Sequence, residues 1–201
     1  MTRKRLTENR GAKPSKPHKL TKAHDRTLFD SGAPELNEWL KKYSWQNLRA
    51  NNATTYVTTS AGSRVIGYYA ITVAGYQRDA VPEAIAKRAP ETVPCFLLAR
   101  LAVDIEWHRR GVGWGLLRDA LQRVLLLSES VAAPALLVHA RDDEARALLL
   151  SSRGVSPVPR RPASSVPADE SDRFAFSKSR RIGIAPRWSA WPRPVPGAKG
   201  T

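Results

Sequence analysis

Residues 101–115 read Leu-Ala-Val-Asp-Ile-Glu-Trp-His-Arg-Arg-Gly-Val-Gly-Trp-Gly, and this stretch decides the fold. The apolar run up to Val103 predicts the end of a strand, and the apolar pattern after Gly115 predicts an amphipathic helix. A glycine-rich turn that opens a helix presents free backbone N–H groups and the positive end of the helix dipole to an anion. A side chain at Gly111 or Gly113 would keep the backbone away from phosphate oxygens. The stretch therefore predicts a phosphate-binding cradle.

Two common phosphate-binding loops do not fit the cradle. A P-loop needs Lys and then Ser or Thr directly after its last glycine, whereas Gly115 is followed by Leu116 and Leu117. A dinucleotide-binding loop has the spacing Gly-x-Gly-x-x-Gly, whereas this chain has Gly-x-Gly-x-Gly. A third design is needed.

Strand and helix patterns on both sides of the cradle predict a mixed α/β domain. Residues 34–43 predict a helix whose inward face carries Leu36, Trp39, Leu40 and Tyr43. Two runs rich in β-branched and aromatic residues predict an antiparallel hairpin around the turn at residues 61–63. In chain order we expect strands over 54–59, 65–73, 95–103 and 135–140, a helix-compatible connection over 82–89, and helices over 111–130 and 142–151.

This order of elements and the turn resemble the GNAT N-acetyltransferases, whose hallmark is Gln/Arg-x-x-Gly-x-Gly/Ala after a strand ending in apolar-Ala-Val. Residues 101–103 match the strand end, and residues 108–113 occupy the hallmark with His108 as the one departure. The resemblance implies an α/β (α+β) fold, with a mixed central sheet flanked by helices, and acetyl-CoA as the co-substrate. It implies that backbone N–H groups bind the pyrophosphate of coenzyme A at Arg109, Arg110, Gly111, Val112, Gly113 and Trp114. It also implies that Leu101, Ala102 and Val103 align the pantetheine arm and polarise the thioester carbonyl.

A narrower resemblance, over residues 17 to about 147, is to the toxin class of GNAT enzymes typified by TacT. It rests on Phe29-Asp30-Ser31-Gly32, the Leu36 to Leu40 segment, Val65 to Tyr69, Leu98 to Asp104, and Val138-His139-Ala140. The resemblance implies acetylation of the α-amine of aminoacyl-tRNA, which blocks translation, and inhibition by a small DNA-binding antitoxin. Such toxins also tend to form homodimers.

Composition bounds the partners and the compartment. The net charge of +15 favours a polyanionic partner, because Lys and Arg that neutralise phosphates release counterions, and a tRNA substrate suits it. The single cysteine, Cys95, and four scattered histidines give no metal-ligand spacing, so we expect no metal. The chain has no apolar run near 18 residues and no apolar signal core after Met1, so we expect a cytoplasmic protein without a membrane partner.

The expected catalytic acid is absent. Related enzymes carry Phe-Tyr a few residues before Gly-Phe, and this tyrosine protonates the departing thiolate; if Gly154 is the family glycine, Leu150 stands at the tyrosine position. Leucine cannot donate a proton, and Ser151 is a candidate substitute. Two interpretations therefore stay open: an active acetyltransferase, or a catalytically impaired GNAT fold that serves as a basic binding module or a GNAT that acts on another amine.

Three segments are expected along the chain. Residues 1–16 predict a flexible basic arm, residues 17–155 the GNAT domain, and residues 156–201 a Pro/Arg-rich tail. The tail is interpreted either as disordered or as the product of a frameshift near codon 148, which would also explain the lost tyrosine. If the frame is shifted, the last strand pair of the fold is expected to be missing.

Overall fold

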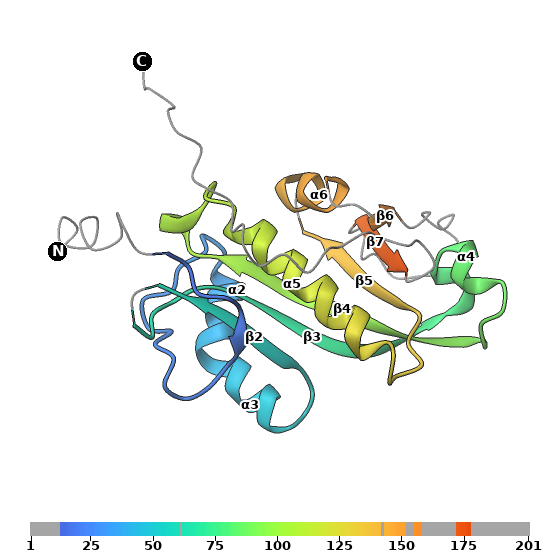
Figure 1. Ribbon diagram of the computed structural model, residues 1–201, viewed down its shortest axis with the longest axis horizontal. Helices are drawn as coiled ribbons and strands as arrows, with labels where there is room; N and C mark the ends of the chain where they lie inside the picture. Colours follow the sequence, from blue (N-terminus) through green and yellow to red (C-terminus); the bar gives the residue numbers. More distant parts are fainter. Residues whose placement is uncertain (1–12, 61, 142, 152–154, 158–171, 178–201) are drawn as a thin grey trace, which may run out of the picture.

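The computed structural model describes residues 13–60, 62–141, 143–151, 155–157 and 172–177 (Figure 1). These residues form a seven-stranded sheet in the order β1-β2-β3-β4-β5-β7-β6. The strands are β1 (His18–Lys19), β2 (Thr54–Thr59), β3 (Val65–Gln77), β4 (Thr92–Val103), β5 (Ala135–Ala140), β6 (Val155–Pro157) and β7 (Asp172–Ser177). All neighbouring strands are antiparallel except β4 and β5, which are parallel. The mixed sheet predicted from the sequence is confirmed.

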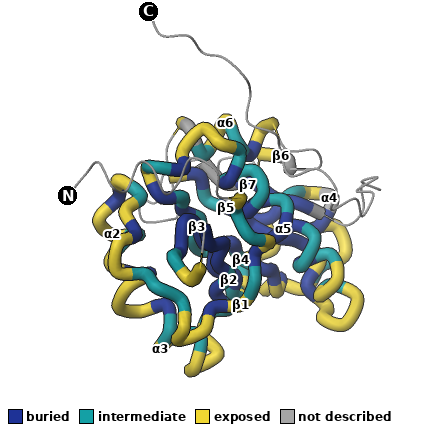
Figure 2. The backbone as a smooth tube through the Cα atoms, turned by 60° about the vertical axis from the view of Figure 1, so that its left-hand side comes forward, coloured by how far each residue is buried: buried dark blue, intermediate teal, exposed yellow. Residues whose placement is uncertain are grey.

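Helices cover both faces of the sheet. One face carries the helical segment made of α2 (Pro34–Glu38), a π-helical turn (Trp39–Tyr43) and α3 (Ser44–Arg49). The other face carries α5 (Val112–Leu127) and α6 (Asp143–Leu150), while α4 (Glu83–Ala86) caps the β3–β4 connection (Figure 1). In Figure 2 the buried central strands lie between these more exposed helices. No helix in the described part of the chain is long and apolar enough to span a membrane.

Close packing of α5 on the sheet fixes the position of its N-terminus. Leu116, Leu117 and Ala120 of α5 are buried in the largest hydrophobic core cluster together with residues of β3, β4 and β5. At Gly67 of β3, a Cβ atom would lie only 3.0 Å from Leu116 Cδ1 and 3.3 Å from Val112 Cγ1. The missing side chain at Gly67 therefore lets the first turn of α5 approach the sheet.

The C-terminal strands, whose absence was expected from a frameshift, are present. Strand β7 pairs antiparallel with β5 from Ala135↔Ser177 to Ala140↔Asp172, and β6 pairs with β7. Phe174 and Phe176 are buried in the same core as α5, so alternating apolar residues complete the sheet. The many prolines and arginines around them made this short alternation hard to recognise in the sequence. The expected disorder or frameshift over the rest of 156–201 falls on residues outside the described part.

Two smaller expectations also change. Tyr43 is 45% exposed rather than inward-facing, because the π-helical turn, in which Ser44 N–H donates to Trp39 O, places Ser44 on the buried face instead. The basic arm was expected to extend to residue 16, but Ser15 is held against the edge of β2. Its N–H donates to Thr59 O at 2.8 Å, and its carbonyl accepts from Thr58 Oγ1 at 2.6 Å.

Candidate functional site

A cavity of about 620 Å³ opens where β4 and β5 diverge. The two strands pair only from Phe96↔Leu136 to Leu98↔Val138, although β4 continues to Val103 and β5 to Ala140. A bulge at the same point adds Ala99 to β4, since Leu98 faces Ile71 of β3 and Arg100 faces Ala70. Within the described residues, the edge of β4 beyond Leu98 makes no further ladder pair with β5. Its backbone is therefore available to a ligand lying in the cavity.

The predicted cradle forms the end of this cavity nearest α5. Gly111 precedes the first residue of α5 with φ +76°, a left-handed conformation that glycine adopts without strain. Arg109 also has a positive φ of +57°, so two left-handed residues turn the chain sharply into the helix. The lining of the cavity includes Arg109, Gly111, Val112, Gly113 and Trp114. These residues were all named from the sequence.

Arg110 is the one cradle residue that the structure does not bring to the cavity. Its guanidinium carbon lies 5.0 Å from the centre of the Trp107 ring, a cation–π distance, and Arg110 is not among the lining residues. His108, the departure from the hallmark, does line the cavity. Its Nε2–H donates to Val103 O at 2.8 Å, because a carbonyl can only accept, and this bond ties the cradle to the end of β4.

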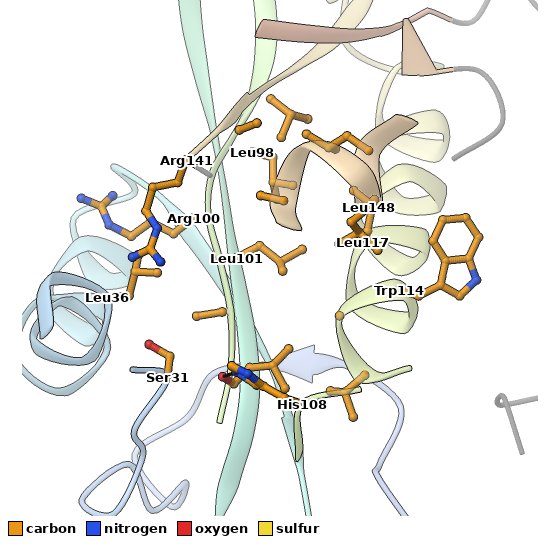
Figure 3. A pocket seen from close by; sticks show the side chains of 18 of the residues that line it. Ser31, Leu36, Leu98, Arg100, Leu101, His108, Trp114, Leu117, Arg141 and Leu148 are labelled. Carbon is orange, nitrogen blue, oxygen red and sulfur yellow. Dashed lines mark hydrogen bonds between the residues drawn. The ribbon is translucent and has the colours of Figure 1, made fainter. Parts of the chain in front are cut away.

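Strand β4 separates two chemically different sides of the cavity (Figure 3). The α5 side is apolar, with Leu101, Trp114, Leu117 and Leu148. The pantetheine residues predicted from the sequence, Leu101, Ala102 and Val103, all line the cavity. This combination of an apolar wall, strand backbone and helix N-terminus suits a long thioester with a phosphorylated end.

The α2 side is polar and was not predicted as part of the site. It holds Ser31, Glu35, Leu36, Arg100 and Arg141. The Arg100 guanidinium stacks on the Trp39 ring, and Arg141 Nη1 donates to Glu35 Oε1 at 2.6 Å. Arg100 interrupts the apolar run 95–103, and this was the sequence signal that could have revealed the polar side of the cavity. A charged residue in a buried strand is rarely found without a partner or access to solvent.

The residues at the expected acid position do not all reach the cavity. Leu148 and Leu149 of α6 line it, whereas Leu150 is 52% exposed and lies outside it. Ser151 is likewise outside the cavity lining, and its hydroxyl donates to Leu148 O at 2.7 Å as a helix-end contact. Half-buried His139, at the end of β5, lines the cavity. Among the lining residues in the described part of the chain there is no tyrosine.

The described residues contain no group of three or more His, Cys, Asp or Glu side chains arranged to hold a metal ion. Glu35 is the one carboxylate among the described lining residues and accepts from Arg141, and the lining also holds Arg100 and Arg109, so the cavity suits an organic phosphate rather than a cation.

Known proteins resemble this chain in both sequence and fold. No family model matches it. It is 39% identical over 133 residues to the tRNA-acetylating toxin of Mycobacterium tuberculosis (strain ATCC 25618 / H37Rv), covering 66% of this chain and 80% of that protein. It is 28% identical over 148 residues to the probable toxin TacT of Sinorhizobium fredii (strain NBRC 101917 / NGR234), covering 69% of this chain and 82% of that protein.

Solved structures share the fold at lower identity. A tyrosine-to-phenylalanine variant of KacT superposes with a TM-score of 0.71 at 23% identity, covering 83% of this chain and 95% of that one. AtaT in complex with acetyl-methionyl-tRNAfMet gives the same TM-score and identity, covering 83% and 96%. A tyrosine-to-phenylalanine variant of AtaT has also been solved with acetyl-CoA and the C-terminus of the antitoxin AtaR.

The splayed strands β4 and β5 and the helix N-terminus of α5 give the chain the GNAT fold that KacT and AtaT share. Within that class, the sequence relationship to the mycobacterial protein is close and covers most of both chains. The chain belongs to the family of tRNA-acetylating toxins.

Proposed function

We propose that this protein transfers the acetyl group of acetyl-CoA to the α-amine of aminoacyl-tRNA. One observation carries the proposal: a single cavity runs from the N-terminus of α5 to the divergence of β4 and β5, and opens toward arginines on the α2 side. The pyrophosphate would bind at residues 109–114, and the pantetheine arm would lie along residues 101–103. Family membership and the net charge of +15 both support a tRNA substrate.

The two sides of β4 suggest how the substrates meet. Acetyl-CoA would enter from the α5 side, and the aminoacyl end of the tRNA would approach Arg100 and Arg141 from the α2 side. The amine nitrogen attacks the thioester carbonyl carbon, the C–S bond breaks, and CoA leaves as the thiol after the amine has lost a proton. An N–H group of the β4 backbone stabilises the carbonyl oxygen as negative charge develops on it. The acetylated amine is no longer a nucleophile for peptide-bond synthesis.

The apolar residues of α6 that line the cavity determine the rate expected for acetyl transfer. An ordinary thiol has a pKa of about 8.5, so a CoA thiolate can leave and take its proton from water. A positioned general acid contributes about 10²–10⁴-fold to such a step, so Leu148 and Leu149 at the wall imply a slow enzyme. The same wall favours a second candidate, a fold that binds acetyl-CoA without turnover.

One partner and one compartment follow from the proposed reaction and family. AtaT has been solved with its antitoxin AtaR, and KacTA with DNA, so we propose that a DNA-binding antitoxin inhibits this chain. Because charged tRNA is a cytoplasmic molecule, we also propose that the protein works in the cytoplasm.

The test incubates the protein with labelled acetyl-CoA and a pool of charged tRNA. The matched variant is Gly111→Val, because a β-branched side chain at φ +76° distorts the cradle. Label on the tRNA that the variant loses supports the proposal. Binding of acetyl-CoA without any transfer supports the second candidate instead, and binding of neither substrate overturns both.

A further inference from the structure

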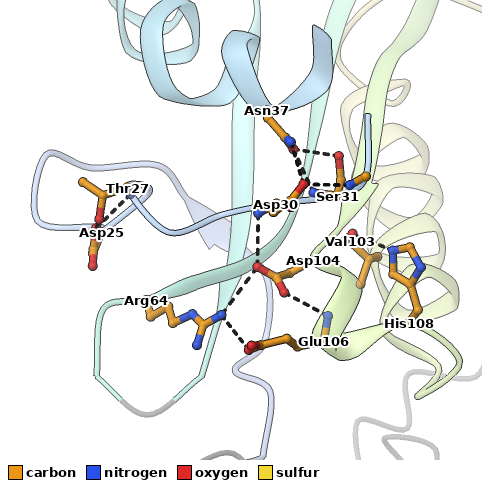
Figure 4. Close-up of polar contacts among 11 residues, drawn as sticks. Asp25, Thr27, Asp30, Ser31, Asn37, Arg64, Val103, Asp104, Glu106 and His108 are labelled. Atoms are coloured by element: carbon orange, nitrogen blue, oxygen red, sulfur yellow. Dashed lines mark hydrogen bonds and ion pairs between the residues drawn. The ribbon is translucent and has the colours of Figure 1, made fainter. Parts of the chain in front are cut away.

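The buried carboxylate of Asp104 does not line the cavity but links two segments that border it. Asp104 follows the last residue of β4, and only 1% of it is exposed. Its Oδ1 accepts the Glu106 N–H at 3.0 Å, and its Oδ2 accepts the Asp30 N–H at 3.3 Å (Figure 4). One buried side chain thus holds two segments that are 76 residues apart in the sequence, at Asp30 and Glu106.

The first segment is the acceptor loop, residues 30–32, on the α2 side. Besides its bond to Asp104, Asp30 O accepts the Ile105 N–H at 2.8 Å. Asp30 Oδ1 accepts Asn37 Nδ2 at 2.8 Å, and Asn37 Oδ1 in turn accepts both the N–H and the hydroxyl of Ser31 at 2.8 Å. Ser31 lines the polar side of the cavity, so this chain of bonds fixes a wall of the acceptor site.

The second segment leads directly into the cradle. The Glu106 N–H bond caps a 3₁₀ turn over Ile105–Trp107, and the Trp107 N–H donates to the backbone carbonyl of Asp104 at 2.8 Å. His108 follows at once, with its ring bonded to Val103 O, and Arg109 then begins the left-handed turn. The start of the cradle therefore depends on where the Asp104 carboxylate lies.

A partly buried arginine supports this arrangement electrostatically. Arg64 Nη2 lies 2.8 Å from Glu106 Oε2 and 3.6 Å from Asp104 Oδ2, with 18% of its side chain exposed. Burial raises the pKa of Asp104, while both backbone N–H bonds and Arg64 oppose that rise. An asparagine at this position would turn an N–H donor toward one of the two backbone N–H groups, so it cannot satisfy both.

We propose that Asp104 is a positioning residue shared by the two substrate sites: it sets the acceptor loop and the coenzyme cradle relative to each other. This inference rests on the proposed function, because it assigns the acceptor to the α2 side and acetyl-CoA to the α5 side. Neither substrate touches Asp104; it acts through Ser31 on one side and through His108 and Arg109 on the other.

The test separates the acceptor loop from the coenzyme cradle with three variants. Asp104→Asn disturbs both the loop and the cradle, Asn37→Ala disturbs only the loop, and Asp25→Asn is a matched control. Asp25 Oδ1 accepts the Thr27 N–H at 2.9 Å in the same two-residue pattern, but Asp25 does not line the cavity. The readouts are the Kd for acetyl-CoA by calorimetry and the KM for charged tRNA at saturating acetyl-CoA.

For Asp104→Asn we expect both constants to rise about tenfold, the usual effect of losing one hydrogen bond to a charged group. Asn37→Ala raises only the tRNA KM, and Asp25→Asn changes neither. If Asp104→Asn lowers the melting temperature while both constants stay at the wild-type values, the inference is wrong. It is also wrong if Asn37→Ala weakens acetyl-CoA binding as much as Asp104→Asn does. If Asp104→Asn does not fold, Asp104→Ser, which keeps one short acceptor, takes its place.

Failure of the proposed function has a different signature. A wild-type protein that binds acetyl-CoA but transfers no label contradicts the proposed function. The calorimetric comparison of Asp104→Asn with Asn37→Ala then still tests whether Asp104 positions the coenzyme cradle. A wild-type protein that transfers label, beside an Asp104→Asn variant with the same constants, contradicts only the inference.

Discussion

The guanidinium carbon of Arg100 lies 4.7 Å from the centre of the Trp39 ring, so an arginine of the central strand is held against the helical segment on the α2 side. Arginine stacked in this way keeps its planar donor edge oriented, and it lines the cavity beside Leu36. We expect this contact to orient a phosphate-binding group near the acceptor end of the tRNA.

Replacing Arg100 therefore affects the acceptor and not the coenzyme. We expect Arg100→Leu to raise the KM for charged tRNA about tenfold, because the variant loses a charge-assisted hydrogen bond to the tRNA. The Kd for acetyl-CoA should change little. Steady-state kinetics at saturating acetyl-CoA measure the first constant and calorimetry the second. Lys22→Leu is the control, because Lys22 also lies over a tryptophan, Trp45, at 5.9 Å but does not line the cavity. A weaker coenzyme affinity in Arg100→Leu would contradict the division of the cavity into two sides.

A tyrosine on the inward side of α6 should accelerate the reaction. Leu148 and Leu149 line the cavity and Leu150 does not, so we expect Leu148→Tyr or Leu149→Tyr to raise kcat by about 10²-fold. The exposed Leu150→Tyr should leave kcat unchanged. Phenylalanine at the same position supplies the ring without the hydroxyl and should give no gain. An increase from Leu150→Tyr alone would contradict the assignment of the acid position to the inward side of α6.

The close approach of α5 to β3 predicts a combined loss of stability and coenzyme affinity. In Gly67→Val the new side chain meets Leu116, Thr58 and Val112 at 3.0–3.3 Å, and overpacking of this kind costs about 2 kcal/mol of unfolding free energy. Because α5 must shift, the Kd for acetyl-CoA should rise as well. Urea unfolding and calorimetry measure the two effects. In the control, Gly62→Ala, the added Cβ meets nothing within 4 Å, but φ is +78°, so backbone strain should lower stability while coenzyme affinity is retained.

Acid should loosen the acceptor loop through Asp30. Hydrogen bonds from the Gly32 N–H and from Asn37 lower the pKa of Asp30 below its ordinary value. A carboxyl with a lowered folded-state pKa stabilises the protein above its unfolded-state pKa of about 3.9, and loses that contribution as the pH falls through the folded-state value. Urea unfolding between pH 5 and pH 3 should therefore show a shallower pH dependence for Asp30→Asn than for the wild-type protein. Equal slopes would show that the Asp30 bonds do not favour its charged form.

Local patterns in the sequence were sufficient to predict the glycine-rich turn at the start of α5 and the strand and helix beside it. The spacing of Gly111 and Gly113 after an apolar strand is a property of consecutive residues, and the structure brings Arg109 and residues 111–114 to the cavity. Arg110 is the exception, because its position depends on contact with the Trp107 ring. The sequence also did not show which residues of α6 face the cavity, since this depends on how α6 packs.

Features that depend on contacts between distant segments were missed. Strand β7 was hidden because its short alternation lies in a Pro/Arg-rich region, and its place in the sheet is fixed by pairing with β5. The polar side of the cavity combines Ser31, Arg100 and Arg141, which are far apart in the sequence. The bond between Asp104 and Asp30 spans 74 residues and follows from the fold rather than from either local pattern.

The most direct test of the central claim is mass spectrometry of the aminoacyl-adenosine released by nuclease after charged tRNA has been incubated with the protein and acetyl-CoA. We predict a product heavier than the substrate by one acetyl group, with the acetyl on the α-amine, and its loss in Gly111→Val. An unmodified aminoacyl-adenosine from a wild-type protein that binds both acetyl-CoA and charged tRNA would contradict the claim.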